Sequence, residues 1–535
     1  MNKMRQFLLL YLNVVSVVTL TAQDISKQEY RQRREQLRKL LPDNSLAVFF
    51  SAPIKNRSND TDYHYHPDPN MVYLSGWEEP HAVLLVFKNL QQDSEGIFSE
   101  VLYVRDRDPY EELWNGKVMG VDRAQDWGLD RVQNRIDFIE SPLNYDAFDS
   151  VLIYEFQNDV RDRPRDNYDL YALQKHFRTQ LNYPAQFNPI RYGLYQKIRQ
   201  LTPRNIKLLQ SEIRRMVALE PGLQDDDLLQ EFLSLTDTSS SEELKIQSDF
   251  LLQNIHFDVD QLPKLMGQLR EIKSKTEIRL LKKAAQISVM GQIEVMKAIH
   301  PEMSEREIQG IHEFVYKKYG AADVGYPSIV GAGGNGCVLH YNHNEMEKVD
   351  NQMVLMDVGA EYKGYTADVT RTLPANGTFT QAQKELYSVV FKAQEAGIAA
   401  AQVGVSFTRI TQAVYDEVTR GLQALGLITQ ANEMSKYLPH GVAHHIGLDV
   451  HDPGEYTFLK PNMVITVEPG IYVPEGSPCD RKWWNIGIRI EDDILITNEG
   501  PINLSDGAPR TWEAIEQQMR SESVLNSWIL PPLED

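Results

Sequence analysis

One pattern for starting a helix occurs three times in the second half of the chain and alternates there with strand-like segments. A Ser or Thr stands three residues before a Glu or Gln, ahead of apolar residues at helical spacing, in Ser274–Glu277, Ser304–Glu307 and Thr380–Gln383. Such capping boxes mark the first turn of an amphipathic helix. Strand pairs are expected between and after these helices, at 326–341, 353–373, 463–473 and 486–497. Helices in one set and antiparallel hairpins in another predict an α+β domain rather than a parallel sheet.

The first half of the chain has a different character. It mixes β-rich runs, at 45–50, 82–87, 100–104 and 151–156, with helical patterns at 26–41 and 203–219. This mixture predicts an α/β domain, and 535 residues exceed what one hydrophobic core usually supports. We therefore expect a leader over 1–23, an N-terminal α/β domain over 24–265, an α+β domain over 266–510 and a C-terminal extension over 511–535.

The leader has the features of a cleaved secretory signal peptide. Lys3 and Arg5 precede an apolar run, which small residues follow. The run has 14 residues, whereas about 20 are needed to span a bilayer, so a retained anchor is the weaker alternative. No later stretch resembles a membrane helix. We expect an exported protein, periplasmic or secreted, without a membrane span after signal removal. Whether the two cysteines, Cys337 and Cys479, pair stays open.

Charge and motifs argue against two common classes of ligand. The formal net charge of −20 disfavours nucleic acid as a partner, because Lys and Arg drive binding to a phosphate backbone. Gly331–Gly336 matches a dinucleotide fingerprint in form, but the residues after it favour a strand where a phosphate-binding helix should begin. We interpret this glycine-rich segment as a tight hairpin loop.

Two aspartates are expected to face each other in the segment 353–372. Its two arms favour strand, and they meet at Lys363-Gly364, a turn signal. Asp357 and Asp368 then lie nearly opposite one another, with Cβ atoms about 4.5–5.5 Å apart. Two ionised carboxylates this close repel strongly unless a divalent cation neutralises them. On this segment alone, the alternative that one aspartate caps a turn or faces water stays open.

Histidines are concentrated in one short segment. Four of the 13 histidines lie within 12 positions, at 440, 444, 445 and 451. A histidine cluster flanked by glycines is a candidate for metal ligation and proton transfer. His444 and His445 point to opposite sides of an extended chain, so one of them is expected to reach a metal.

Two glutamates complete the candidate site. Glu468 ends an apolar run before Pro469-Gly470, and Glu491 lies on an alternating strand, on the same face as Arg489. An ion pair with Arg489 is the alternative for Glu491. Four carboxylates and one imidazole form an oxygen-rich set, which favours manganese(II), or cobalt, zinc or iron(II), over a sulfur-rich structural zinc site. Two such ions can activate water and stabilise an oxyanion.

These residues stand in a series of motifs that resembles aminopeptidase P (Xaa-Pro aminopeptidase), one of the pita-bread metallopeptidases. The motifs follow in order along the chain: Ser328–Tyr341, the Asp357/Asp368 hairpin, His440–His444, Leu448–Asp452, Val467–Gly470 and Gly487–Asp492. The segment Met71–Pro80 is similar to the N-terminal domain of that family. The resemblance implies a pita-bread catalytic domain over 266–510, preceded by a creatinase/aminopeptidase P N-terminal-like domain.

The resemblance also implies a role for each candidate residue. Two divalent ions would be held by Asp357, Asp368, His444, Glu468 and Glu491. Asp368 and Glu491 would be shared between the ions. Glu468 would help to move a proton of the attacking water, while His340 and His451 would stabilise the tetrahedral intermediate and assist the leaving proline nitrogen. The walls of a proline pocket would be formed by Tyr326, His440, Tyr472 and Arg489.

The implied activity is hydrolysis of the N-terminal Xaa-Pro bond of peptides that carry proline in the second position. The implied assembly is a homo-oligomer, a dimer or tetramer. A prolidase that accepts only Xaa-Pro dipeptides would use the same ligands and is the nearest alternative. A creatinase-like hydrolase without metal is a weaker alternative, because it would not need all five ligands. A third alternative is a pita-bread domain that serves only to bind protein or RNA, which broken metal ligation would indicate.

Overall fold

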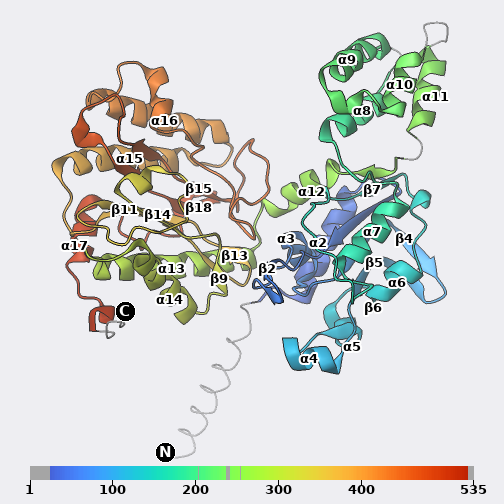
Figure 1. Ribbon diagram of the computed structural model, residues 1–535, viewed down its shortest axis with the longest axis horizontal. Helices are drawn as coiled ribbons and strands as arrows, with labels where there is room; N and C mark the ends of the chain where they lie inside the picture. The colour runs from blue at the N-terminus through green and yellow to red at the C-terminus, as the bar shows by residue number, and fades with distance from the viewer. Residues whose placement is uncertain (1–23, 203, 236–240, 253–254, 528–535) are drawn as a thin grey trace, which may run out of the picture. The chain divides into compact units, whose positions relative to one another are not determined.

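The computed structural model of the protein describes residues 24–202, 204–235, 241–252 and 255–527, so the predicted signal peptide lies outside the described residues. The chain forms two compact units, one of Lys27–Leu265 and the other of the residues from Met266 onward. Each unit combines helices with strands (Figure 1).

The first unit is built on a mixed sheet with the strand order β6-β5-β4-β1-β7-β8. β4 pairs antiparallel with β1 and β5, whereas β7 runs parallel to β1 and β8, and β6 parallel to β5. The strands are β1 (Ser45–Phe50), β4 (Val83–Asp93), β5 (Gly96–Val104), β6 (Arg131–Asn134), β7 (Ser150–Leu152) and β8 (Phe257–Asp258), with a separate ribbon of β2 (Asn56–Ser58) and β3 (Thr61–Asp62). Parallel pairs need crossover connections, which helices supply here.

The helices of this unit form two groups. One group packs on the sheet, where Phe177 and other aromatic side chains fill the core. It consists of α2 (Lys27–Leu40), α3 (Pro69–Ser75), α5 (Gly120–Ala124), α6 (Arg135–Glu140) and α7 (Leu170–Gln180), whereas α4 (Pro109–Asn115) has no buried residue. The other group has an apolar core of its own around Ile213 and Phe232. It consists of α8 (Pro189–Arg199), α9 (Ile206–Leu219), α10 (Asp227–Ser234) and α11 (Ser241–Leu251), and α12 (Gln261–Arg270) follows.

Antiparallel strands form the centre of the second unit. The sheets have the orders β10-β11-β14, β13-β12-β9, β15-β18-β19 and β16-β17. The strands are β9 (Asp323–Val324), β10 (Ile329–Ala332), β11 (Met353–Val358), β12 (Ala360–Tyr362), β13 (Tyr365–Thr366), β14 (Val369–Pro374), β15 (Val464–Val467), β16 (Gly470–Val473), β17 (Ile486–Arg489), β18 (Asp492–Thr497) and β19 (Gly500–Asn503). Antiparallel pairing beside separate helices confirms the α+β class predicted for this half.

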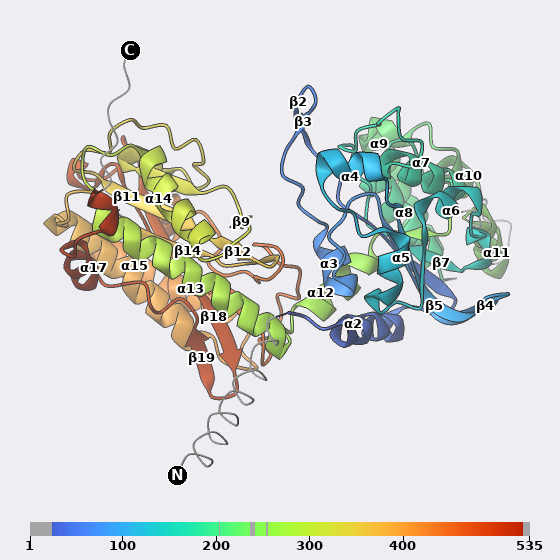
Figure 2. The same ribbon diagram turned by 90° about the horizontal axis from the view of Figure 1, so that it is seen from below.

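Two helix pairs flank these strands, one on either side (Figure 1). The pairs are α13 (Lys275–Ala298) with α14 (Glu305–Lys318), and α15 (Gln381–Ala400) with α16 (Phe407–Ala424). The capping boxes predicted at Ser274 and Thr380 form in full, and Ser304 caps α14. The long α13 crosses the whole unit in Figure 2, and α17 (Trp512–Met519) packs on it with Ile515 in the core.

Three of the predicted strand pairs, at 326–341, 463–473 and 486–497, are wrong. In the last of these, β17 and β18 lie in different sheets and do not pair with each other. β10 pairs with β11, and the glycine-rich segment after it forms a 3₁₀ helix, η4 (Gly333–Cys337), so the residues at 338–341 make no second strand. β15 and β16 lie in different sheets, because Glu468-Pro469 between them redirects the chain. Both cysteines are free thiols in the structure.

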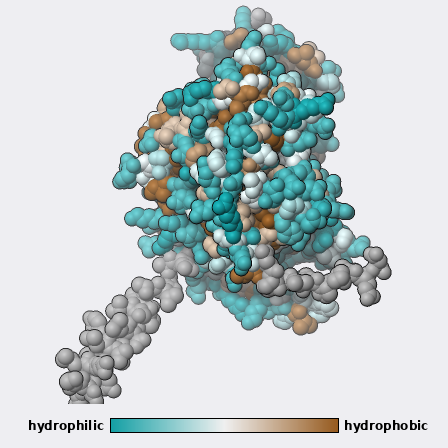
Figure 3. Space-filling view, turned by 90° about the vertical axis from the view of Figure 1, so that its left-hand side faces the viewer, coloured by the Kyte–Doolittle hydropathy of each residue, from teal (hydrophilic) through white to brown (hydrophobic). Residues whose placement is uncertain are grey.

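The surface offers no sign of a membrane segment within the described residues. None of their helices combines the length and the apolar character needed to cross a bilayer. Hydrophilic residues predominate on the face shown in Figure 3, with hydrophobic residues in small groups among them.

Candidate metal centre

A cavity of about 300 Å³ in the second unit brings together most of the residues predicted to do chemistry. All five predicted metal ligands line it, and so do four of the other predicted site residues, His340, His440, His451 and Arg489. The remaining lining residues are Leu339, Gly441 and Ala443. Tyr326 and Tyr472, predicted as walls of a proline pocket, are not among the lining residues, but each hydrogen-bonds to one of them, Tyr326 to Asp357 and Tyr472 to Arg489.

The strand register explains how the two glutamates meet. Val467, the last residue of β15, pairs with Asp492, the first residue of β18. Glu468 and Glu491 are the next residue on each side of that pair, so they leave the sheet together at the same edge. The sequence placed Glu491 inside a strand, but the strand breaks there between β17 and β18. Arg489 forms its ion pair with Asp357, not with Glu491.

The two aspartates do not face each other as directly as predicted. Asp357 pairs with Thr370, and Asp368 lies two residues nearer the turn. The arms kink between them, at Gly359 and Ala367, before β12 and β13 continue to the predicted turn at Lys363-Gly364. Gly359 is required at the kink because a Cβ there would lie 1.7 Å from the Ala367 carbonyl oxygen. Both carboxylates still reach one hydroxyl, because the Tyr326 hydroxyl oxygen lies 2.7 Å from Asp357 Oδ1 and 2.5 Å from Asp368 Oδ1.

The donor atoms fit a divalent cation. One ligand atom from each of Asp368, His444 and Glu491 lies within 4.8 Å of the other two. His444 Nε2 is also 3.3 Å from Glu468 Oε1 and 3.7 Å from Asp368 Oδ2. Burial lowers the pKa of His444 to about 4, so its imidazole is neutral at pH 7 and free to bind a metal. Its Nδ1 is 3.0 Å from the His445 carbonyl oxygen, a contact that would leave Nε2 as the donor to a metal.

The carboxylates repel one another in the absence of a cation. Burial and the charges of Glu491 and Asp357 raise the pKa of Asp368 well above its usual value, and burial with the charge of Glu491 does the same for Glu468. Burial and Asp357 raise the pKa of Glu491 to about 8. Asp357 differs, because Arg489 and Tyr326 outweigh its burial and lower its pKa. Such a concentration of negative charge is the condition that a metal pair would relieve.

The metal-free protein is therefore expected to lose stability as the pH rises from 7 to 8.5. A folded carboxyl with a raised pKa holds its proton more tightly than the unfolded chain does, so its contribution is present at low pH and is lost through the folded pKa. Glu491 alone, with a pKa of about 8, accounts for about 1 kcal/mol over this window, and Asp368 and Glu468 act in the same direction. Buried histidines act oppositely, but near pH 6.5 and below. Thermal unfolding of the chelator-treated protein at several pH values would show this loss of stability. Added Mn²⁺ should abolish the loss. A stability that does not change with pH would contradict the predicted repulsion between the carboxylates.

Two chains of contacts orient the groups around the cavity. Arg489 donates to Asp357 at 2.6 Å and to the Tyr472 hydroxyl at 2.7 Å, and that hydroxyl is 2.9 Å from His440 Nε2. The Tyr472 hydroxyl thus holds the side chains of His440 and Arg489 in place. The ring of His451 stands edge-on to that of His444, with centroids 4.5 Å apart. His340 is exposed at the rim, on the loop after η4.

Three supporting residues escaped the sequence analysis. Thr370 donates its hydroxyl to Glu491 at 2.6 Å. Arg371 donates to the Glu491 carbonyl at 2.8 Å and forms a fully buried ion pair of 2.7 Å with Asp492. Thr370 could have been suspected, because strand alternation places it on the same face as Asp368. Nothing local distinguishes Arg371 or Asp492 from residues of an ordinary exposed strand.

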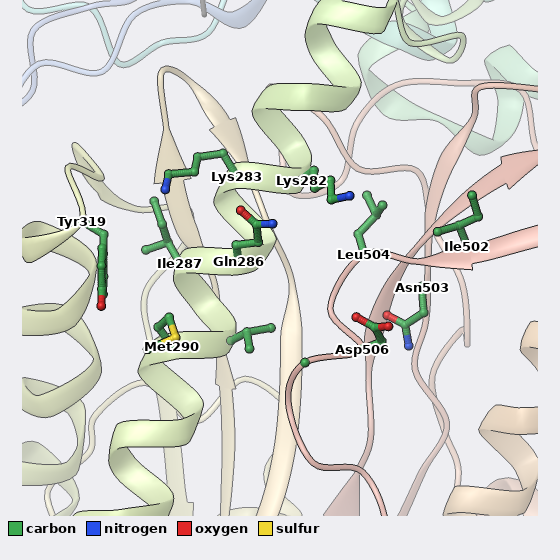
Figure 4. Close-up of a pocket in the computed structure, with 12 residues that line it drawn as sticks. Lys282, Lys283, Gln286, Ile287, Met290, Tyr319, Ile502, Asn503, Leu504 and Asp506 are labelled. Carbon is green, nitrogen blue, oxygen red and sulfur yellow. The ribbon is translucent and has the colours of Figure 1, made fainter.

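A larger cavity of about 530 Å³ lies elsewhere on the second unit, on the outer side of α13. Figure 4 shows its lysines, Lys282 and Lys283, with Tyr319 and the apolar residues Ile502 and Leu504. It contains neither a histidine nor a cluster of carboxylates, so the candidate chemistry lies in the smaller cavity.

Comparison with known proteins agrees with this location. The model of metallopeptidase family M24 matches residues 279–498, and the model of the aminopeptidase P N-terminal domain matches residues 30–144. The chain is 32% identical to the Xaa-Pro aminopeptidase of Escherichia coli (strain K12), over 93% of this chain and 98% of that protein. It is 30% identical to Xaa-Pro aminopeptidase 3 of Rattus norvegicus, over 92% of this chain and 86% of that protein.

A solved structure extends the similarity to the fold. The structure of aminopeptidase P from E. coli with the inhibitor Pro-Leu superposes with a TM-score of 0.71 at 30% identity. The match covers 93% of this chain and 98% of that one. Similarity therefore runs through both units and is not confined to the candidate metal centre.

Proposed function

The chain belongs to the aminopeptidase P family of metallopeptidases, and we propose on this premise that it is a Xaa-Pro aminopeptidase, which hydrolyses the bond between an N-terminal residue and a following proline. The fold agrees with the predicted one, an N-terminal domain followed by a pita-bread domain. Family, fold class and enzyme class are thus confirmed.

The observation that carries the proposal is the convergence of four carboxylates and one neutral imidazole on a single cavity. Asp357, Asp368, His444, Glu468 and Glu491 come from segments that are far apart in the sequence, and they line the same 300 Å³. A module that only binds protein or RNA has no use for this arrangement, because buried like charges destabilise a fold unless a cation joins them. Two divalent ions held there would lower the pKa of water and polarise the substrate carbonyl.

The residues around the ligands suit the remaining tasks. Glu468 lines the same cavity as the other ligands, and we assign to its carboxylate the proton that the attacking water gives up. His340 and His451 also line the cavity, and we assign to them the hydrogen bonds to the developing oxyanion and to the leaving proline nitrogen. The free α-amine of a peptide would be attracted to the negative field around Asp357, and this contact would set which bond lies over the metals.

Selection of proline is assigned to the predicted pocket residues. Of these, His440 and Arg489 line the cavity, and the Tyr472 hydroxyl contacts both. Burial and the nearby Arg489 lower the pKa of His440 to about 4, so a neutral ring faces the substrate at pH 7. Because proline has no N–H, a wall shaped for its ring can select it without offering an acceptor.

Three finer features belong to the same proposal. Manganese(II) is the proposed metal, because the ligands are mostly carboxylate oxygens. Export to the periplasm or the medium is proposed from the leader sequence. A homo-oligomer is proposed because α4 exposes Tyr110, Leu113 and Trp114, each at least 69% accessible, and exposed aromatic groups are typical of interfaces. Sequencing of the mature N-terminus tests the export, and light scattering tests the oligomeric state.

Hydrolysis of defined peptides tests the function. We expect Ala-Pro-Ala to be cleaved after alanine, and Ala-Ala-Ala to be cleaved about 10²-fold more slowly. Chelation should abolish the activity, and Mn²⁺, Co²⁺, Zn²⁺ and Fe²⁺ should each be added back separately, with Mn²⁺ expected to restore most. Turnover of Ala-Pro but not of Ala-Pro-Ala would assign a prolidase instead. Undiminished turnover by the metal-free protein would exclude the proposed mechanism.

A further inference from the structure

A second buried carboxylate, outside the metal centre, binds both ends of the loop that carries His340. Glu305, the first residue of α14, is completely buried. Its Oε1 accepts from the Ala332 backbone N–H at 2.7 Å and from Asn335 Nδ2 at 3.0 Å. Its Oε2 accepts from the Tyr341 hydroxyl at 2.8 Å and from the Met346 N–H at 2.9 Å. All four donors are uncharged, and the first turn of a helix favours a negative charge.

The loop depends on this carboxylate because it has little regular structure of its own. After η4 the chain has no helix or strand until β11 begins at Met353. The four donors lie before, within and after the stretch that contains Leu339 and His340, and the Tyr341 hydroxyl also accepts from the Glu345 N–H at 3.2 Å. The Glu305 N–H in turn donates to the Met346 carbonyl at 3.0 Å. Glu305 therefore joins the start, the middle and the end of the loop, and we call this set of four hydrogen bonds the clamp.

The side chain held by this clamp points to the reaction site. His340 and Leu339 line the cavity, and His340 itself is exposed. Tyr341, the next residue, is buried and is the one that Glu305 binds. None of the five candidate metal ligands lies on this loop, so its position should affect the chemistry without affecting metal binding.

We propose that Glu305 is a positioning residue for hydrolysis: it holds His340 against the substrate by closing the loop 332–346. The inference rests on the proposed function, because it takes His340 as the group that stabilises the transition state. A displacement of about 1 Å at such a group can cost about 10²-fold in rate, so loss of the clamp should lower kcat more than it raises KM.

Glu305→Gln is the direct test, because glutamine keeps the shape but places an amide N–H against donors. On Ala-Pro-Ala, kcat should fall about 10- to 100-fold, with the metal content unchanged. Tyr341→Phe removes one of the four donors and should give a smaller fall in the same direction. Glu307→Gln, at an exposed position two residues along the same helix, is the matched control and should leave kcat unchanged.

A double-mutant cycle separates positioning from general stability. In a His340→Ala background, Glu305→Gln should lower kcat by less than about 3-fold, because the group it positions is gone. An equal factor in both backgrounds, or no effect in either, would overturn the inference while leaving the proposed function intact. An inactive native enzyme would overturn the proposed function instead.

Hydrogen–deuterium exchange gives a readout that needs no activity. Glu305→Gln should speed exchange of amides in 333–346 relative to the rest of the second unit. Unchanged exchange there would show that the carboxylate does not hold the loop.

Discussion

Replacing Asp368 with asparagine is expected to lower kcat/KM for an Ala-Pro-Ala peptide by about 10³-fold, which corresponds to about 4 kcal/mol of transition-state stabilisation. Asp368 lies at the middle of the ligand group. One of its oxygens faces the Tyr326 hydroxyl beside Asp357, and the other faces His444. An asparagine has one oxygen for ligation and no charge, so it cannot serve two ions at once. Metal analysis should find fewer bound ions per chain than in the native protein.

The same change is expected to stabilise the metal-free protein. Burial, Glu491 and Asp357 raise the pKa of Asp368 well above its usual value, so keeping it ionised at high pH works against the fold. A neutral amide of the same shape removes that penalty. The substitution should thus lower the activity of the metal-loaded enzyme and raise the stability of the chelator-treated protein.

An exposed aspartate provides the control. Asp506 lies on the surface of the same unit, so Asp506→Asn should change neither activity nor metal content. Unfolding midpoints of the three chelator-treated proteins at pH 8 complete the comparison. Loss of activity together with loss of stability in Asp368→Asn would mean that Asp368 is a structural residue, and the ligand group would then have to be redrawn.

Local signals predicted much of the second unit. The helix starts at Ser274 and Thr380 form as expected, because a capping box satisfies backbone donors that no other residue can reach. The turn at Lys363-Gly364 also forms as expected, because glycine readily adopts the positive φ of 78° that Gly364 has there. The predictions that failed concern which strands pair with each other. The segments 463–467 and 470–473 look like one hairpin, yet they join different sheets, because distant strands β17 and β18 compete for them.

The candidate ligands could be listed from sequence because the motifs around them are distinctive. The contacts that surround these ligands could not be predicted. Arg371 meets the Glu491 carbonyl across 120 positions, and Asp492 meets Arg371 across 121, and nothing in either local pattern indicates burial. The alternation around Glu491 even favoured an ion pair with Arg489, whereas the break after β17 turns Arg489 toward Asp357. Such contacts are set by how sheets pack, which single-segment patterns do not contain.

Removing the carboxylate of Asp492 is expected to cost about 3–5 kcal/mol of stability. Asp492 is completely buried and accepts from Arg371 at 2.7 Å, from the Ser505 hydroxyl at 2.7 Å and from Gln394 at 2.8 Å. Asp492→Ala leaves the buried guanidinium of Arg371 without its counter-charge, and that uncompensated charge is the main part of the cost. The thermal midpoint should fall by about 5–10 °C.

A matched surface pair calibrates this effect. Arg420 and Glu417 form an ion pair on α16 with the arginine 67% exposed. Glu417→Ala should change stability by less than about 1 kcal/mol, because solvent screens the charges. Similar losses in Asp492→Ala and Glu417→Ala would show that the Arg371–Asp492 pair is not buried as described.

The paired variant Arg371→Met/Asp492→Leu distinguishes stability from function. Replacing both charges with apolar groups removes the desolvation penalty along with the attraction, so most of the lost stability should return. Metal affinity should not return. Arg371 also holds the backbone carbonyls of Thr370 and Glu491, at 2.8 Å each, and methionine cannot replace those bonds. Contacts that orient ligands from behind are worth about 10- to 100-fold in affinity, so a stable protein with weakened metal binding is the expected result. Recovery of both properties would mean that the ion pair serves the fold alone, and that Glu491 is positioned by its strand without help from Arg371.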